Sequence, residues 1–125
     1  MNENVDKSSF GYEATWAKTD NYVSKILVFE NVGSGLPMHF HKTTEKSWFV
    51  NSGKFKVQWI DTATAGLHEQ ELNEGDVWHN PPLQPHRLIC MKADSSITEV
   101  STPDSVEDNY RVAPGDTQRT APTDG

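Results

Sequence analysis

Cysteine, basic residues and long apolar runs are scarce in this sequence, and each shortage excludes a class of protein. A single cysteine, Cys90, rules out an intrachain disulfide framework and makes a reducing cytosol the expected compartment. Lysine and arginine number 11 against 18 acidic residues, and the formal net charge of −7 repels phosphate backbones and anionic membrane surfaces. We therefore expect neither nucleic acid nor a membrane as a partner.

Segments that could cross a membrane or act as a secretory signal are also missing. The N-terminus, "MNENVDKSSF", is polar. No stretch reaches the ~18 apolar residues that a membrane span needs. The sequence therefore predicts a soluble, cytoplasmic protein, and its 125 residues match the usual size of one domain with one core.

Short strand-like runs take the place of helical periodicity. The runs are "YVSKILVFE", "SWFV", "KFKVQWI", "DVWHN", "HRLICM" and "SITEV", and turn residues such as Gly, Pro, Asn and Asp separate them. Many short strands with such turns predict an all-β sandwich or small barrel. Residues 1–9 and 113–125 contain little apolar surface, so we expect them to be disordered tails around one domain at residues 10–112.

Two histidines, His39 and His41, stand one residue apart in "MHFHKTTEKSW". Side chains alternate along an extended chain, so both imidazoles are expected to point the same way. Taken alone, such a pair is also typical of a hydrophilic surface. A third histidine, His86, follows a proline-rich turn that would deliver it to the start of a strand. Together the three histidines favour a metal site.

The spacing of these residues resembles the two motifs of the cupins, small antiparallel β-barrels in which both motifs surround one metal. In the first motif a glycine precedes H-x-H by five residues and another glycine ends the motif. In the second a glycine precedes a proline by five residues and a histidine follows. The matching residues are Gly33, His39, His41 and Gly53 for the first motif, and Gly75, Pro81 and His86 for the second.

The flanking segments "GYEATWAKTDNYVSKILVF" and "EVSTPDSVEDNYRV" resemble those of small phosphomannose-isomerase-like cupins, which handle sugars or sugar phosphates. The resemblance covers residues 10–112. It implies an antiparallel cupin barrel, also called a double-stranded β-helix or jelly roll. It also implies one divalent transition metal, held by His39, His41 and His86, and three imidazoles suit Zn, Fe, Mn, Ni or Co.

The sequence departs from the cupin motif at the carboxylate ligand. Lys46 stands seven residues before Gly53, where the family usually has a glutamate, and Glu45 is one residue early. In a regular strand Glu45 and Lys46 point to opposite faces. A bulge at residues 43–46 would restore Glu45 as a ligand, and alternatively both side chains are solvated. A Lys46 that faces the metal must be neutral, stay back from it, or pair with a carboxylate such as Glu99.

Glu99 and Lys46 are the candidate catalytic residues. The resemblance implies that Glu99 lies beside the metal as a general base or substrate contact, whereas otherwise it is an exposed strand glutamate. Lys46 would serve as a proton shuttle or as a positive group that binds an anionic ligand. His79 fits a fourth nitrogen, a substrate contact or a hydrogen-bonded structural histidine, and His68 is expected in a loop.

Three functions are compatible with these residues. The first is an isomerase or epimerase of a small sugar, sugar phosphate or related hydroxy-carbonyl compound, in which the metal polarises the substrate oxygens. The second is an Fe(II)-dependent dioxygenase, because a three-histidine face with open positions can activate oxygen. The third is a non-catalytic small-ligand-binding or interaction protein, motivated by the lysine at the usual glutamate position.

The expected partners are a small-molecule ligand, which the lysine predicts to be anionic, and a second copy of the chain. Small open barrels leave strand edges that proteins usually cover. We therefore expect a homodimer through a barrel edge, with "YVSKILVF" as the contributing strand because it is the longest apolar run.

Overall fold

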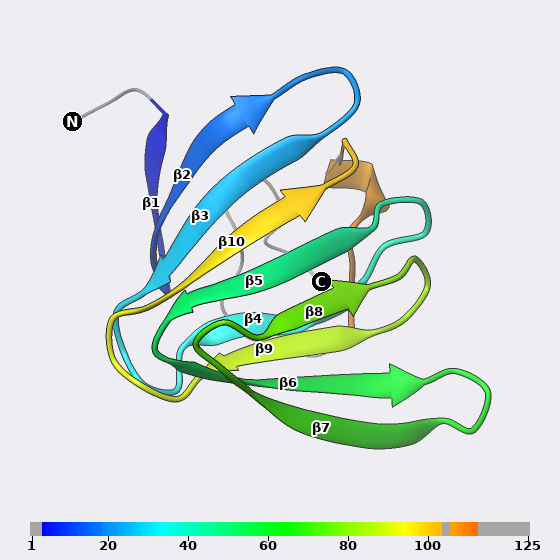
Figure 1. The fold of residues 1–125 in the computed structure, drawn as a ribbon. Helices are drawn as coiled ribbons and strands as arrows, with labels where there is room; N and C mark the ends of the chain where they lie inside the picture. The colour runs from blue at the N-terminus through cyan, green and yellow to red at the C-terminus, as the bar shows by residue number, and fades with distance from the viewer. Residues whose placement is uncertain (1–3, 104–105, 113–125) are drawn as a thin grey trace.

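The computed structural model describes residues 4–103 and 106–112 of the chain, which fold as short β-strands and one turn of 3-10 helix (Figure 1). In chain order these elements are β1 (Val5–Ser8), β2 (Gly11–Lys18), β3 (Val23–Phe29), β4 (Gly35–Phe40), β5 (Lys46–Ser52), β6 (Lys54–Asp61), β7 (Gly66–Asn73), β8 (Val77–Asn80), β9 (His86–Cys90), β10 (Ser95–Ser101), η1 (Val106–Asp108) and β11 (Tyr110–Arg111).

The strands form two antiparallel sheets. One has the order β1-β2-β3-β10-β5-β8, and the other has the order β11-β4-β9-β6-β7. Figure 1 shows the first sheet curving above the second, so that strands distant in sequence, such as β3 and β10, run side by side. This arrangement confirms the all-β antiparallel barrel expected from the sequence.

Alternation along the strands selects the residues that face the interior. In β5, Lys46, Trp48 and Val50 are buried while Ser47 and Phe49 are exposed. Because opposed residues of paired strands share a face, the inward residues line up in rows across the sheets. The hairpin from β5 to β6 turns at Gly53, whose φ is 82° and where an added Cβ would lie 1.9 Å from the hydroxyl of Ser95. Glycine is needed at this turn.

One end of the interior is apolar. Leu27, Ile97 and Val50 form a row across β3, β10 and β5, and none of the three is exposed. Phe29 packs between the rings of Phe10 and Phe55, with centroid distances of 4.4 and 5.2 Å. We call this region the apolar end.

The other end of the interior is polar, and it begins one row further along the same strands. There Lys25, Glu99 and Trp48 are opposed across β3, β10 and β5. In the second sheet His39 and His86 are opposed across β4 and β9. Charged and imidazole groups therefore gather at this polar end, and the apolar end supplies the packed core.

The structure differs from the sequence expectation at residues 5–8. They form β1, which pairs with β2 in register from Val5 opposite Ala14 to Ser8 opposite Gly11. Low apolar content does not exclude a strand here, because the hairpin supplies backbone hydrogen bonds to this short edge strand. Residues 113–125, expected as a C-terminal tail, lie outside the described residues.

Two further expectations change with the topology. Strand β3, which contains most of "YVSKILVF", lies between β2 and β10, so it is not an edge available to a second copy. His68 lies within β7 rather than in a loop. In the part of the chain that the structure describes, no helix has the length and apolar character needed to cross a membrane.

Candidate metal centre

The three histidines expected as ligands come together at the polar end. His39 in β4 opposes His86 in β9, and His41 follows β4 directly. Each offers one ring nitrogen, and these nitrogens all lie within 4.8 Å of one another. All three side chains are buried. Small side-chain adjustments would bring the nitrogens to metal–nitrogen bonds of about 2.0–2.1 Å.

Hydrogen bonds to backbone carbonyls fix the tautomer of each ring. The Nδ1 atoms lie 2.6 Å from Pro37 O for His39, 2.6 Å from Asp108 O for His41 and 3.0 Å from Gln84 O for His86. A carbonyl oxygen only accepts, so each Nδ1 carries the proton and each Nε2 keeps its lone pair.

The Nε2 atoms of His41 and His86 are buried without a hydrogen-bond partner among the described residues. Buried polar atoms are normally satisfied. Metal-binding histidines have the arrangement seen here, with one nitrogen bound to a carbonyl and the other directed to the ion. The three residues therefore fit a divalent metal.

Burial keeps the three imidazoles neutral. It is the largest cause that lowers the pKa of His39, and the neighbouring His86 lowers it further. The pKa of His86 falls to about 3, mainly through burial. The pKa of His41 is also lowered, by burial and then by the ammonium of Lys46. At neutral pH no proton has to leave before a metal binds.

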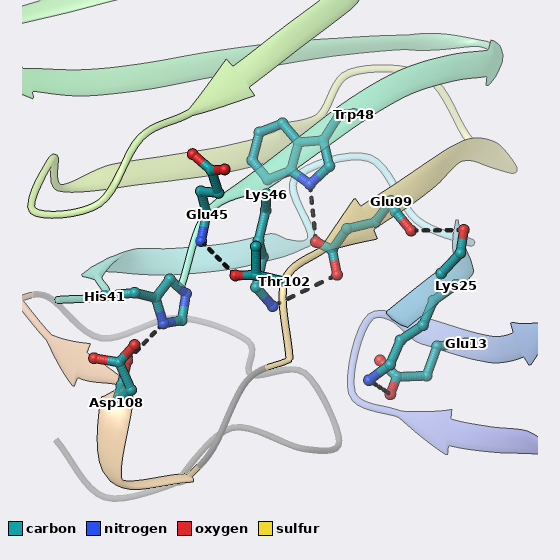
Figure 2. A network of polar contacts seen from close by, with 10 residues as sticks. Glu13, Lys25, His41, Glu45, Lys46, Trp48, Glu99, Thr102 and Asp108 are labelled. Carbon is teal, nitrogen blue, oxygen red and sulfur yellow. Dashed lines mark hydrogen bonds and ion pairs between the residues drawn. The ribbon is translucent and has the colours of Figure 1, made fainter. Parts of the chain in front are cut away.

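Lys46 points into the barrel and pairs with Glu99. Its Nζ lies 3.6 Å from Glu99 Oε1, and Glu99 Oε2 accepts a 2.9 Å hydrogen bond from the indole of Trp48 (Figure 2). Lys46 and Glu99 are both buried. An inward Lys46 was expected to be neutral, to stay back from the metal or to pair with a carboxylate, and in the structure it pairs with Glu99. Both proposed catalytic residues thus lie together at the polar end.

Glu45 does not join the histidine cluster. Its side chain is 49% exposed, and its carboxylate lies 3.6 Å from Nε2 of His79. Figure 2 shows the carboxylate directed away from His41 and Lys46. No bulge restores it: the backbone N–H of Glu45 donates to the hydroxyl of Thr102, and β5 pairs regularly with β8 from Lys46 onward. The expectation of Glu45 as a metal ligand is therefore corrected.

His79, considered as a fourth nitrogen, also lies away from the cluster. It opposes Ser47 across β8 and β5, and the Ser47 hydroxyl lies 3.0 Å from its Nδ1. More than half of its side chain is exposed. His79 is thus a hydrogen-bonded histidine on the outer face of the sheet and not a fourth nitrogen of the cluster.

Asp108 organises the turn that carries His41. Its carboxylate accepts hydrogen bonds of 2.7–3.1 Å from the backbone N–H groups of Lys42, Thr43 and Thr44. The hydroxyls of Thr43 and Thr44 donate to it as well, and its backbone carbonyl accepts the His41 Nδ1–H (Figure 2). Burial alone would raise the pKa of Asp108, but these hydrogen bonds hold it well below its usual range.

The segment after Asp108 lies against the strand that carries His39. Tyr110 and Arg111 oppose Phe40 and His39 across β11 and β4. The rings of Tyr110 and Phe40 stack at 5.1 Å, and Nζ of Lys42 lies 4.8 Å above the Tyr110 ring. Sequence reasoning missed the role of Asp108 because it depends on contacts some 65 residues apart in the chain.

Aromatic side chains complete the polar end. The ring of Trp48 lies 5.7 Å from His86, and Trp59 opposes His86 across β6 and β9. Half-buried Trp59 packs 4.7 Å from Trp78 and 5.4 Å from His68. All three tryptophans therefore contact the core, and Trp48 also approaches the histidine cluster.

Solved structures with this architecture were found, although no protein-family model and no curated protein matches the sequence. KdgF from Halomonas sp. aligns with TM-score 0.66 and 19% identity, over 77% of this chain and 81% of that one. The neighbours share the cupin barrel. This chain has the cupin fold.

Two longer cupins align as well. Oxalate decarboxylase from Bacillus subtilis matches with TM-score 0.74 and 16% identity, over 86% of this chain and 29% of that one. The capsular polysaccharide assembling protein CapF from Staphylococcus aureus matches with TM-score 0.75 and 16% identity, over 88% of this chain and 32% of that one. The chain thus spans about a third of each, and these identities establish the fold alone.

Proposed function

We propose that this protein is a metal-dependent cupin that acts on a small sugar, sugar phosphate or related hydroxy-carbonyl compound, in an isomerase or epimerase type of reaction. The observation that carries the metal is the convergence of three buried imidazoles, in which the Nε2 atoms of His41 and His86 have no hydrogen-bond partner among the described residues. Zn, Fe, Mn, Ni and Co are the candidate ions. One matched structure describes Mn(II) centres in Bacillus subtilis oxalate decarboxylase, which supports a divalent first-row metal.

A bound metal would supply polarisation of the substrate carbonyl and hydroxyl oxygens. The proposed base is Glu99, which takes a proton from the carbon that bears the hydroxyl and returns it to the neighbouring carbonyl carbon, while the hydroxyl proton passes to the former carbonyl oxygen. The indole of Trp48 holds one carboxylate oxygen by a hydrogen bond, and Lys46 offsets the charge of the other. These contacts orient the carboxylate so that it need not reorganise during proton transfer.

Hydrogen exchange into the substrate tests this proposal. Metal-loaded protein is incubated in D₂O with a panel of hydroxy-carbonyl compounds, and NMR follows deuterium entry beside the carbonyl. We expect exchange with the parent and with His79→Ala, which removes an exposed histidine outside the cluster, and none with His41→Ala. Equal exchange in all three proteins, or none with a parent shown to hold metal, would contradict the enzymatic proposal.

An Fe(II)-dependent dioxygenase is the second candidate. It is favoured by the set of ligands. Three neutral imidazoles, without the carboxylate of Glu45, leave at least two coordination positions on the metal open, so that substrate and oxygen could both bind there. Oxygen consumption by the Fe(II)-loaded protein, measured with the same panel, separates the two reactions. Uptake that depends on His41 would replace the isomerase proposal, and its absence would remove the dioxygenase.

We further propose that the ligand is anionic. A metal held by three neutral imidazoles keeps its full +2 charge, and the ammonium of Lys46 beside it offsets the charge of Glu99, so the site remains positive. Lys46→Glu should tighten metal binding and weaken anion binding, whereas Lys46→Met should keep the metal and lose the anion preference. Identical anion affinities in the three proteins would remove this part of the proposal.

The second copy of the chain remains our proposal for a protein partner, through a sheet face instead of β3. Exposed apolar side chains of Phe49, Val77 and Val100 line a groove of about 440 Å³ on the outer face of β5, β8 and β10. Such a contiguous apolar face is typical of an interface. Sedimentation should give a dimer for the parent and a monomer for Val77→Glu; a monomeric parent would end the proposal.

A further inference from the structure

Asn80, at the end of β8, is a buried polar residue, and only one end of its side-chain amide has a hydrogen-bond partner among the described residues. It is 1% exposed. Its Oδ1 accepts a 2.9 Å hydrogen bond from the indole N–H of Trp78. Because an indole nitrogen only donates, this bond fixes which end of the amide is the oxygen. The other end, Nδ2, has no hydrogen-bond partner among the described residues.

The position of Asn80 in the sheet brings this amide to the polar end. Asn80 directly opposes Lys46 across β8 and β5, and opposed residues of antiparallel strands share a face with Cβ atoms about 4.5–5.5 Å apart. Trp78 likewise opposes Trp48, whose ring approaches His86. The ammonium of Lys46 lies close enough to lower the pKa of His41. Asn80, Lys46 and the histidine cluster therefore belong to one region of the interior.

The chemistry of the two side chains defines what they would bind. The ammonium of Lys46 and the Nδ2 group of Asn80 both only donate hydrogen bonds, and the ammonium is positive. A negatively charged group with two acceptor oxygens can accept from each donor through a separate oxygen and also complements the ammonium charge, whereas a neutral hydroxyl or carbonyl oxygen offers no charge to the ammonium. Lys46 has three N–H donors, so it can keep its contact with Glu99 and still bind such a group.

We propose that Lys46 and Asn80 form an oxyanion subsite that binds the carboxylate or phosphate of the ligand beside the metal. The inference rests on the proposed metal-dependent function and narrows its substrate class. The compound would carry the oxyanion close to the hydroxyl or carbonyl oxygen that reaches the metal, as in a short hydroxy acid. Asn80 is then a specificity-determining residue.

Calorimetric titration of Zn²⁺-loaded protein with glycolate, and separately with inorganic phosphate, tests the subsite. Asn80→Asp removes the donor and adds a negative charge, and we expect it to weaken anion binding at least tenfold. Asn80→Ala should weaken it several-fold. The matched control is Asn51→Asp, which adds the same charge where the amide oxygen accepts a hydrogen bond from Thr98, and it should bind like the parent.

Side-chain amide NMR of the parent keeps the test decisive even if the Asn80 variants do not fold. Glycolate or phosphate should shift the Asn80 NH₂ resonances of the Zn²⁺-loaded protein and leave those of Asn51 in place. A response to glycolate alone assigns a carboxylate site, and a response to phosphate alone assigns a phosphate site.

Failure of this inference differs from failure of the metal proposal. Parent protein that takes up Zn²⁺ but binds neither anion, or whose anion affinity is unchanged in Asn80→Asp, would overturn the oxyanion subsite alone. A parent that takes up no Zn²⁺ would instead remove the metal proposal on which the subsite depends.

Discussion

The apolar and polar ends of the barrel interior are built by the same strands but do different things. In β10, Ile97 belongs to the apolar row and Glu99, two residues later, belongs to the polar row. Both side chains are buried. The apolar end gains stability from area removed from water. A buried ion pair such as Lys46–Glu99 is weak evidence for stability, because desolvation offsets much of the attraction.

This difference indicates where fold and function reside. Large-to-small substitutions at the apolar end should destabilise the fold, whereas the replacement of a buried ion pair by apolar residues of similar size is often neutral for stability. A buried ion pair next to three imidazoles with lowered pKa values is typical of a functional site.

The largest predicted effect comes from disturbing the apolar end. Phe29→Ala removes a fully buried ring that packs between Phe10 and Phe55. We expect the free energy of unfolding to fall by about 3–5 kcal/mol, while Zn²⁺ affinity of the folded fraction is unchanged. Denaturant unfolding measures the first and metal titration the second. A loss below about 1 kcal/mol would show that this ring is not part of the core that holds the barrel.

Breaking the ion pair at the polar end should lower the free energy of unfolding by a comparable amount. A second substitution should restore most of that stability. Lys46→Met removes the ammonium that lies 3.6 Å from the buried carboxylate of Glu99, and we expect a loss of about 3 kcal/mol in the free energy of unfolding. The double variant Lys46→Met, Glu99→Gln removes the charge and keeps an acceptor for the indole of Trp48. It should recover most of that loss; a double variant as unstable as the single one would show that the pair stabilises the fold.

Removing the carboxylate that organises the His41 turn should have a smaller effect on stability and a clear one on metal binding. Asp108→Ala deletes the acceptor of five hydrogen bonds. We expect a loss of about 1–3 kcal/mol in stability and a 10- to 100-fold loss in Zn²⁺ affinity. Glu107→Ala, an exposed neighbour, is the control. Unchanged Zn²⁺ affinity in Asp108→Ala would mean that the turn does not position His41.

The smallest predicted effect is the pH dependence of the metal-free protein. The unfolded chain protonates His86 near its ordinary pKa of 6.5, whereas burial holds the folded pKa at about 3. Stability from this group is therefore complete above pH 6.5 and is lost as the pH falls toward 3. Between pH 7 and 5.5 the loss should be about 1 kcal/mol. Denaturant unfolding of the parent and of His86→Ala isolates this contribution, and equal pH slopes would refute it.

The fold and the three histidines were predictable because their signals are local. Alternation of side chains marks the strands, and the spacing of His39 and His41 places both imidazoles on one side. The placement of Glu45 and Lys46 was left open because it depends on whether β5 begins with a bulge. Contacts from Thr102, distant in sequence, decide against the bulge.

The remaining parts of the site depend on contacts that no local pattern records. Asp108 binds the His41 ring through a backbone carbonyl, so its side-chain type gives no hint of that role. Asn80 becomes informative only when its register with Lys46 and its bond to Trp78 are known. The position of β3 inside a sheet likewise follows from strand order, which apolar run length does not determine.

Metal content tests the central claim most directly. The parent chain and His86→Ala are purified without added metal or chelator, and elemental analysis measures the metal bound per chain. We predict about one equivalent of a divalent first-row ion in the parent, because three neutral imidazoles converge at the polar end. His86→Ala, which lacks one of those ligands, should retain almost none. A metal-free parent, or the same metal content in both proteins, would contradict the account.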